Sequence, residues 1–231
     1  MEDGKKMNNL NILYEDNHII VVIKPFNTPV QEDSSKDLDM LTLIKKYLKE
    51  KYNKPGNVYL GLVHRLDRPV SGVMVFAKTS KAASRLSDMI RRDLFHKKYL
   101  AIVHGRCKDK DKLVDKISKD NKTYSSFIDN KNGRESILEY KTLVYDKEND
   151  LSLIDINLIT GRHHQIRLQM SNNNHPIYGD QRYGMQEKKQ IALFAYKLEF
   201  IHPVTKNMLT FKYFPKEDGV WKMLKEVKEK L

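Results

Sequence analysis

The sequence has almost no cysteine and no long apolar run. Cys107 is the only cysteine among 231 residues, which excludes an intramolecular disulfide and any metal site built from several thiolates. The longest purely apolar runs, residues 19–23 and 73–77, are far shorter than the roughly 18 residues of a membrane-spanning helix. Residues 1–10 also lack the apolar centre of a signal peptide. We therefore expect a cytoplasmic protein that has no membrane partner.

The single cysteine has two interpretations. Arg106, Lys108 and Lys110 lie close to Cys107 in the sequence, and such cations would lower the pKa of its thiol and favour a nucleophilic thiolate. No signature of a cysteine protease surrounds it, however. The favoured interpretation is therefore a structural cysteine.

Acidic residues are scarce relative to basic ones. The chain has 42 Lys and Arg against 30 Asp and Glu, which is a formal net charge of +12 at pH 7. Such an excess attracts polyanions, and each phosphate contact releases counterions, so nucleic acid is the favoured partner. A lysine-rich surface that only confers solubility is the alternative. Binding to an acidic membrane is disfavoured, because no basic helix has an apolar face with aromatic anchors.

Hydrophobic periodicity predicts many strands and few helices. We expect strands over residues 18–24, 59–63, 73–77, 99–103, 137–145, 151–158, 191–200 and 209–214. Helices are expected over residues 38–51, over 163–170, and around Trp221, Leu224 and Val227. A further helix is expected after a cap at Thr79 or Ser80, with Arg91, Arg92 and Lys97 at its C-terminal end. The charged run 108–122 is expected to form a solvated loop or a hairpin. This order favours an α+β fold with a mainly antiparallel (mixed) central sheet flanked by helices over a doubly wound fold.

Residues 64–72, with the sequence His-Arg-Leu-Asp-Arg-Pro-Val-Ser-Gly, form a charged connection between two expected strands. Asp67 lies between Arg65 and Arg68, and two cations favour the ionised carboxylate that a nucleophile or an electrostatic stabiliser requires. A surface ion pair is the alternative.

Residues 160–167, with the sequence Thr-Gly-Arg-His-His-Gln-Ile-Arg, form a second polar segment. Gly161 permits a tight turn, and Arg162 and Gln165, three residues apart, can present donors to a phosphate or a base edge. A solvated helix face is the alternative.

Four histidines in the C-terminal half could suggest a metal site: His163, His164, His175 and His202. Their spacing matches no zinc signature, and no pair of carboxylates accompanies them. We therefore expect no metal site.

Together these segments resemble the RluA-type family of RNA pseudouridine synthases. The resemblance extends over about residues 12–214 in four ordered blocks, which are His64-Arg65-Leu66-Asp67 with Ser71-Gly72 and residues 76–79; Lys97-Lys98-Tyr99 leading to Gly105; residues 161–167 with 175–180 and 183–184; and Leu198, Phe200, His202, Pro203 and Thr205. Gln169 and Phe194 stand where many members have histidine. Each block alone is weak evidence, whereas the ordered set is specific.

The resemblance implies the catalytic-domain fold of these enzymes and an isomerisation of uridine to pseudouridine. It makes Asp67, Tyr99 and Arg167 the catalytic residues: Asp67 acts on the nucleotide, Tyr99 lies against the extruded uracil, and Arg167 pairs with Asp67. Arg65 would fill the space that the base leaves. The expected RNA-binding residues are His64, Arg65, Arg68, Arg162 and Gln165.

The reaction has no redox step, so no cofactor and no metal are expected. Asp67 could attack C1′ of the ribose or C6 of the uracil, or else removal of a ribose proton could give a glycal, and the sequence does not choose among these routes. A non-catalytic RNA-binding or RNA chaperone protein is the second hypothesis. A glycosidase is weaker, because such enzymes need two carboxylates.

Residues 1–11 are expected to be a flexible N-terminal tail, and residues 12–231 the catalytic domain. Because only about eleven residues precede the first block, we expect no S4-type RNA-binding domain. The expected partner is ribosomal or transfer RNA. No obligatory protein partner is expected, and the protein is expected to be a monomer.

Overall fold

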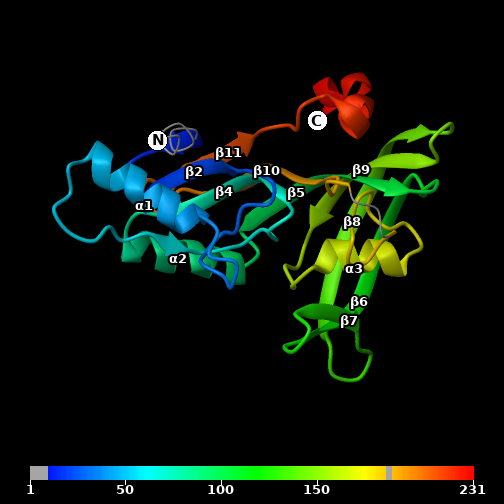
Figure 1. Cartoon of the computed structure of the whole chain (residues 1–231), viewed down its shortest axis with the longest axis horizontal. Coiled ribbons are helices and arrows are strands. Elements are labelled where there is room, and N and C mark those ends of the chain that lie inside the picture. Colours follow the sequence, from blue (N-terminus) through cyan, green and yellow to red (C-terminus); the bar gives the residue numbers. More distant parts are fainter. Residues whose placement is uncertain (1–9, 186–188) are drawn as a thin grey trace. The chain divides into compact units, whose positions relative to one another are not determined.

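The computed structural model describes residues 10–185 and 189–231 (Figure 1). Most of the expected N-terminal tail therefore lies outside the described residues. The chain forms two compact units. The first unit consists of the described residues up to Phe95 together with Lys197–Tyr213, and the second consists of His96–Tyr196 and Phe214–Leu231. The prediction of one catalytic domain over residues 12–231 stays a prediction.

The first unit combines short antiparallel strands with two helices. Its elements are β1 (Asn11–Glu15), β2 (Ile19–Lys24), α1 (Met40–Lys51), β3 (Gly61–Leu62), β4 (Ser71–Ala77), α2 (Ser80–Arg91), the end of β10 (Leu193–Ile201) and β11 (Met208–Lys212). β2 pairs with β1 and β4, β3 pairs with β4, and β10 pairs with β11. Every residue of β2 and β4 is buried, as expected for continuous apolar runs. These strands are the core of the unit.

Both helices of the first unit begin at a side-chain cap. The Asp39 carboxylate accepts hydrogen bonds from Thr42 N at 3.1 Å and Thr42 Oγ1 at 2.7 Å, which satisfies a backbone donor in the first turn of α1. Thr79 Oγ1 accepts from Ala82 N at 3.2 Å and starts α2. Of the two caps expected for this helix, the structure uses Thr79. Both predicted helices are confirmed, and α1 begins two residues later than predicted. The prediction that Lys97 belongs to the last turn of α2 is wrong, because α2 ends at Arg91 and Lys97 lies on β5.

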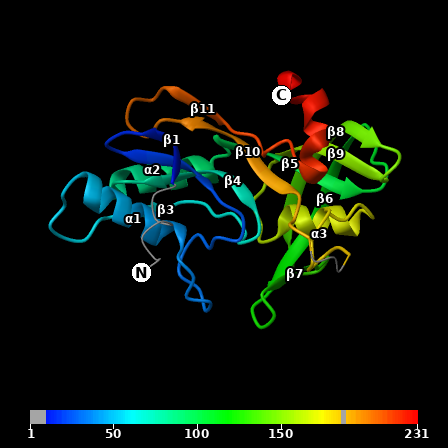
Figure 2. The same cartoon turned by 45° about the horizontal axis from the view of Figure 1, so that its top comes forward.

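The second unit is a twisted antiparallel sheet with one α-helix beside it. Its elements are β5 (Phe95–His104), β6 (Lys110–Asp120), β7 (Ser125–Ile128), β8 (Arg134–Asp146), β9 (Leu151–Leu158), α3 (Gln165–Asn172), the start of β10, and the 3₁₀-helices η1 (Gly219–Glu226) and η2 (Lys228–Lys230). The strand order is β5-β9-β8-β6-β7. Figures 1 and 2 both show α3 beside β6 and β7. All strand pairs described here are antiparallel, which confirms the expected α+β fold class.

The charged run 108–122 forms part of a hairpin, one of its two expected forms. β6 alternates between buried Leu113 and Ile117 on one face and exposed Lys112 and Lys116 on the other. Buried and exposed residues alternate along β6, which is typical of a half-buried strand. The many lysines made this alternation hard to recognise in the sequence. The residues of the C-terminal amphipathic pattern form a 3₁₀-helix. No helix in the described part of the chain is long and apolar enough to cross a membrane.

Cys107 is buried in the second unit. Burial raises the pKa of its thiol to about 11, and the hydrogen bond with Ser152 only partly opposes this effect. The expected lowering of this pKa is therefore wrong, because burial removes the hydration that a thiolate needs. The structural interpretation of Cys107 is confirmed.

Candidate active site

The turn that carries Asp67 joins β3 to β4 in the first unit. Leu66 and Val70, on either side of it, are buried, and Val70 N donates to Asp67 O at 3.0 Å. Gly72, at the start of β4, has φ of 138°, a conformation that glycine adopts without strain. Core packing and a closed turn therefore fix the backbone around the carboxylate.

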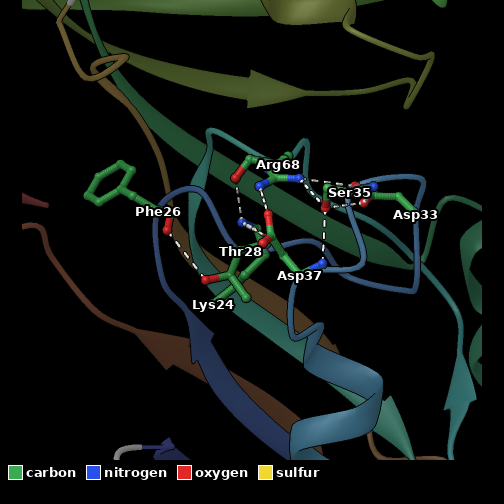
Figure 3. A network of polar contacts seen from close by, with 7 residues as sticks. All are labelled: Lys24, Phe26, Thr28, Asp33, Ser35, Asp37 and Arg68. Atoms are coloured by element: carbon green, nitrogen blue, oxygen red, sulfur yellow. Dashed lines mark hydrogen bonds and ion pairs between the residues drawn. The ribbon is translucent and has the colours of Figure 1, made fainter. Parts of the chain in front are cut away.

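Lys24, which the sequence patterns did not single out, donates a hydrogen bond to the backbone of this turn. Its side chain is completely buried, and Nζ donates to Pro25 O at 2.9 Å. Nζ also donates to Thr28 O at 2.8 Å and to Arg68 O at 2.9 Å (Figure 3). Ser71 Oγ donates to Lys24 O at 2.6 Å. A lysine that ends an apolar strand directly before a proline was the available sequence signal.

Lys24 also interacts electrostatically with the catalytic candidate. Burial lowers the pKa of Lys24 to about 7, whereas the charge of Asp67 opposes this change and that of Arg68 adds to it. The buried side chain of Lys24 therefore lies close enough to Asp67 for the two charges to interact, although burial disfavours the ammonium form of Lys24.

The Arg68 guanidinium is bound by an acidic loop. Nη1 donates to Ser35 Oγ at 2.8 Å and lies 3.4 Å from Asp33 Oδ2, while Nη2 donates to Asp37 Oδ2 (Figure 3). Arg65, by contrast, is exposed. Of the two arginines beside Asp67, Arg68 thus has carboxylate partners already.

His64 is anchored inside the first unit. Its Nε2 accepts a hydrogen bond from Val75 N at 3.1 Å, and its ring meets the Phe95 ring edge-on at a centroid distance of 5.2 Å. The prediction that His64 binds RNA stays a prediction.

In the second unit, Arg167 forms a two-point ion pair with Asp180. Nε donates to Asp180 Oδ2 and Nη2 donates to Asp180 Oδ1, both at 2.8 Å, and both side chains are buried. Burial raises the pKa of Asp180, but the hydrogen bonds and charge of Arg167 outweigh burial and hold that pKa below its usual value. Asp180 was part of the recognised block, but no role had been assigned to it.

Gln165 shapes the turn before α3. Its side chain is buried, and Oε1 accepts from Thr160 Oγ1 at 2.9 Å and from Arg162 N at 3.0 Å. Nε2 donates to Gln169 Oε1 at 2.9 Å. The exposed Arg162 donates from Nε to Glu135 O at 3.2 Å. Gln165 therefore fixes the backbone of Arg162 in this turn. The prediction that Gln165 binds RNA stays a prediction.

Tyr99 lies on β5, is buried, and is opposite Ile156 of β9. Two residues earlier, Lys97 approaches the turn before α3, since a Cβ added to Gly161 would lie 3.0 Å from Lys97 Nζ. The second and third recognised blocks therefore meet within the second unit. The predicted pairing of Arg167 with Asp67 joins residues of different units and stays a prediction.

The four histidines considered for a metal site have other partners. They are hydrogen-bonded as follows: His163 to Ser126 Oγ, His164 to Tyr183 OH, His175 to His104 O and His202 to Asp16 Oδ2. Within residues 10–185 and 189–231, no three His, Cys, Asp or Glu side chains group closely enough to hold a metal ion.

Residues 18–172 match the sequence model of a family described as RNA pseudouridylate synthase. The ribosomal large subunit pseudouridine synthase C of Buchnera aphidicola subsp. Baizongia pistaciae is 35% identical over 211 residues, which are 85% of this chain and 64% of that protein. The Bacillus subtilis protein named uncharacterized RNA pseudouridine synthase YjbO is 34% identical over 224 residues, or 94% of this chain and 76% of that one. The chain thus spans less than two thirds of the length of the Buchnera relative.

The fold is similar to that of human RNA pseudouridylate synthase domain containing 4. The TM-score is 0.73 at 22% sequence identity, and the similarity covers 89% of each chain.

Proposed function

The chain belongs to the RNA pseudouridylate synthase family, and from this membership we propose that it is an isomerase that converts uridine to pseudouridine in RNA. In this reaction the N1–C1′ bond breaks and a C5–C1′ bond forms, while N1 gains a proton and C5 loses one. The observation that carries the proposal is the turn of residues 64–72, where the buried side chain of Lys24 donates to Arg68 O at 2.9 Å and interacts electrostatically with Asp67.

Asp67 is the proposed catalytic carboxylate. It acts by attack on C1′ or C6, or through a glycal formed by loss of a ribose proton. Lys24 supports this role by donating to Arg68 O, which fixes the residue after Asp67, and by its electrostatic interaction with Asp67.

Tyr99 and Arg167 are the proposed partners of Asp67. Tyr99 stacks against the uracil after that base leaves its own stack, and stacking on an aromatic side chain contributes about 1–3 kcal/mol per base. Arg167 pairs with the Asp67 carboxylate and orients it. The two hydrogen bonds that Arg167 donates to Asp180 support this role, because they limit rotation of the guanidinium.

His64, Arg65, Arg68, Arg162 and Gln165 are the proposed RNA-binding residues. The exposed guanidinium of Arg65 fills the space that the base leaves, and the exposed Arg162 binds phosphate. The net charge of +12 supports a polyanionic substrate.

Ribosomal RNA is the substrate that we propose first, because the name of the Buchnera relative refers to the ribosomal large subunit. Transfer RNA is the second substrate to test. We propose that the chain acts in the cytoplasm as a monomer, without a cofactor or metal.

The test is the release of tritium from RNA labelled at C5 of uridine, because the C5 hydrogen leaves when the C5–C1′ bond forms. Ribosomal and transfer RNA transcripts are incubated with the native protein, with Asp67→Asn, and with the matched surface variant Asp88→Asn. We expect release by the native protein and Asp88→Asn and none by Asp67→Asn. Equal release of tritium by all three proteins would reject Asp67 as the catalytic carboxylate. If the native protein binds RNA tightly but releases no tritium, a non-catalytic RNA-binding protein is favoured.

A further inference from the structure

The segment between β2 and α1 is acidic in an otherwise basic protein. Its charged residues are Glu32, Asp33, Lys36, Asp37 and Asp39, four acids and one base in a chain of net charge +12. Asp39 caps α1 and is buried. Asp33 and Asp37 both pair with Arg68 (Figure 3).

The loop is folded around the guanidinium of Arg68. Ser35 Oγ accepts from Arg68 Nη1 at 2.8 Å and from Asp37 N at 3.2 Å, and Ser35 N donates to Asp33 Oδ1 at 2.9 Å. Hydrogen bonds from Ser35 and the charge of Arg68 lower the pKa of Asp33, and the hydrogen bond from Arg68 lowers the pKa of Asp37. Both carboxylates are therefore ionised at neutral pH, and the group of one cation and two anions has a charge of −1.

This group is next to the proposed catalytic residue and within reach of a polyanion. Arg68 directly follows Asp67, and its carbonyl is held by Lys24 at 2.9 Å. The Arg68 and Asp33 side chains are each 40% exposed, and Asp37 is 54% exposed. A guanidinium in this place is a natural ligand for phosphate, but here carboxylates occupy its donors.

We propose that Asp33 and Asp37 are specificity-determining residues that keep Arg68 from binding the phosphates of non-substrate RNA. The inference rests on the proposed function. RNA attracted only by the net charge meets a locally negative group beside Asp67 and gains nothing from Arg68. A substrate RNA, anchored by its other contacts, displaces the carboxylates, since exposed ion pairs are weak and a phosphate accepts the same two-point bond. Selectivity of this kind uses a repulsive element as well as attractive ones.

The experiment compares two double variants that remove the same negative charge from the first unit. Asp33→Asn/Asp37→Asn opens the group around Arg68, while Glu50→Gln/Asp88→Asn removes carboxylates that pair with Lys46 on α1 and with Arg91 and Arg92 on α2. Binding to poly(A), which contains no uridine and is no substrate, is measured over a range of salt concentrations.

We expect Asp33→Asn/Asp37→Asn to bind poly(A) about three- to tenfold more tightly than the control double variant. Its plot of log K against log salt should be steeper by about 0.7, as one more phosphate contact on a single strand predicts. Adding Arg68→Gln should abolish both gains. The single variant Asp37→Asn, which leaves Asp33 and Ser35 in place, should show a smaller gain in affinity for poly(A). It is the control for an effect that comes only from disruption of the loop.

Equal binding of poly(A) by the two double variants would overturn the inference. A gain that persists with Arg68→Gln would overturn it too, because the released cation would not be Arg68. Reduced tritium release at unchanged poly(A) binding would assign the loop a purely supporting role and also reject it. Failure of the proposed function is a separate result, since the native protein would then release no tritium from any uridine-containing RNA.

Discussion

Arg167 and Asp180 form a buried ion pair in which Nε contacts Oδ2 and Nη2 contacts Oδ1, each at 2.8 Å. Asp180 Oδ1 also accepts from Arg182 N at 2.9 Å and from Tyr183 N at 3.2 Å. The carboxylate thus joins the first turn of α3 to the loop after the helix, and the loop sets the orientation of the guanidinium. Arg167 is consequently positioned before any substrate binds.

Asp180→Asn should destabilise the protein by about 3 kcal/mol, because it leaves a buried guanidinium without its counter-charge. The rate of tritium release should fall as well, since Arg167 loses its fixed orientation. Urea unfolding and single-turnover release, the latter at a temperature where the variant is folded, measure the two effects. Asp111→Asn, which removes an exposed ion pair with Lys108, should change neither. A variant of native stability would contradict the role of the pair.

Lys24→Met should cost about 3 kcal/mol of stability, because three backbone carbonyl oxygens lose the donor that they share. It should also slow tritium release by folded enzyme, since the carbonyl of Arg68, directly after Asp67, loses its donor and Asp67 loses its electrostatic interaction with Lys24. The matched control is Lys78→Met, a buried lysine that binds Glu15 and Asp16 O. That control should lose stability but keep the native rate, and equal rates in the two variants would refute the role of Lys24.

Glu15→Gln should make stability depend less on pH in the acid range. Burial raises the pKa of Glu15, but hydrogen bonds from Lys51, Lys78, Tyr52 and Tyr47 outweigh it and lower that pKa to about 2, from the ordinary 4.5. The folded state therefore gains stability above pH 4.5 and loses it as the pH falls toward 2. We expect the native protein to exceed the variant by about 2–3 kcal/mol at pH 7 and by far less near pH 2. Thermal unfolding at both pH values measures this, and a constant difference would contradict it.

Arg162→Gln should weaken RNA binding without slowing the reaction of RNA that is already bound. Removing one phosphate contact should reduce the slope of log K against log salt by about 0.7–0.9. Filter binding at several salt concentrations gives the slope, and single-turnover release at saturating protein gives the rate. Arg91→Gln removes an equally charged, exposed residue of α2 and should leave the slope unchanged. Identical slopes for the two variants would argue against phosphate binding by Arg162.

Local patterns predicted most elements, because each depends on residues close together in the sequence. The apolar run of β2 and the caps Asp39 and Thr79 act over one to four residues. Where the local signal was mixed, prediction was less specific, as for β6, whose lysines hid Leu113 and Ile117. β1 and β7 were not predicted, since such short strands need a partner to identify them.

By itself, the sequence determined the α+β class, the turn that carries Asp67, and membership of the family, since these depend on periodicity and ordered motifs. Only the tertiary structure decided which partners the charged side chains bind. Lys24 binds a carbonyl 44 residues away, and Arg68 binds Asp37 across 31. No local pattern encodes such pairings, because they arise when the packing of strands and loops brings distant groups together and removes water from around them.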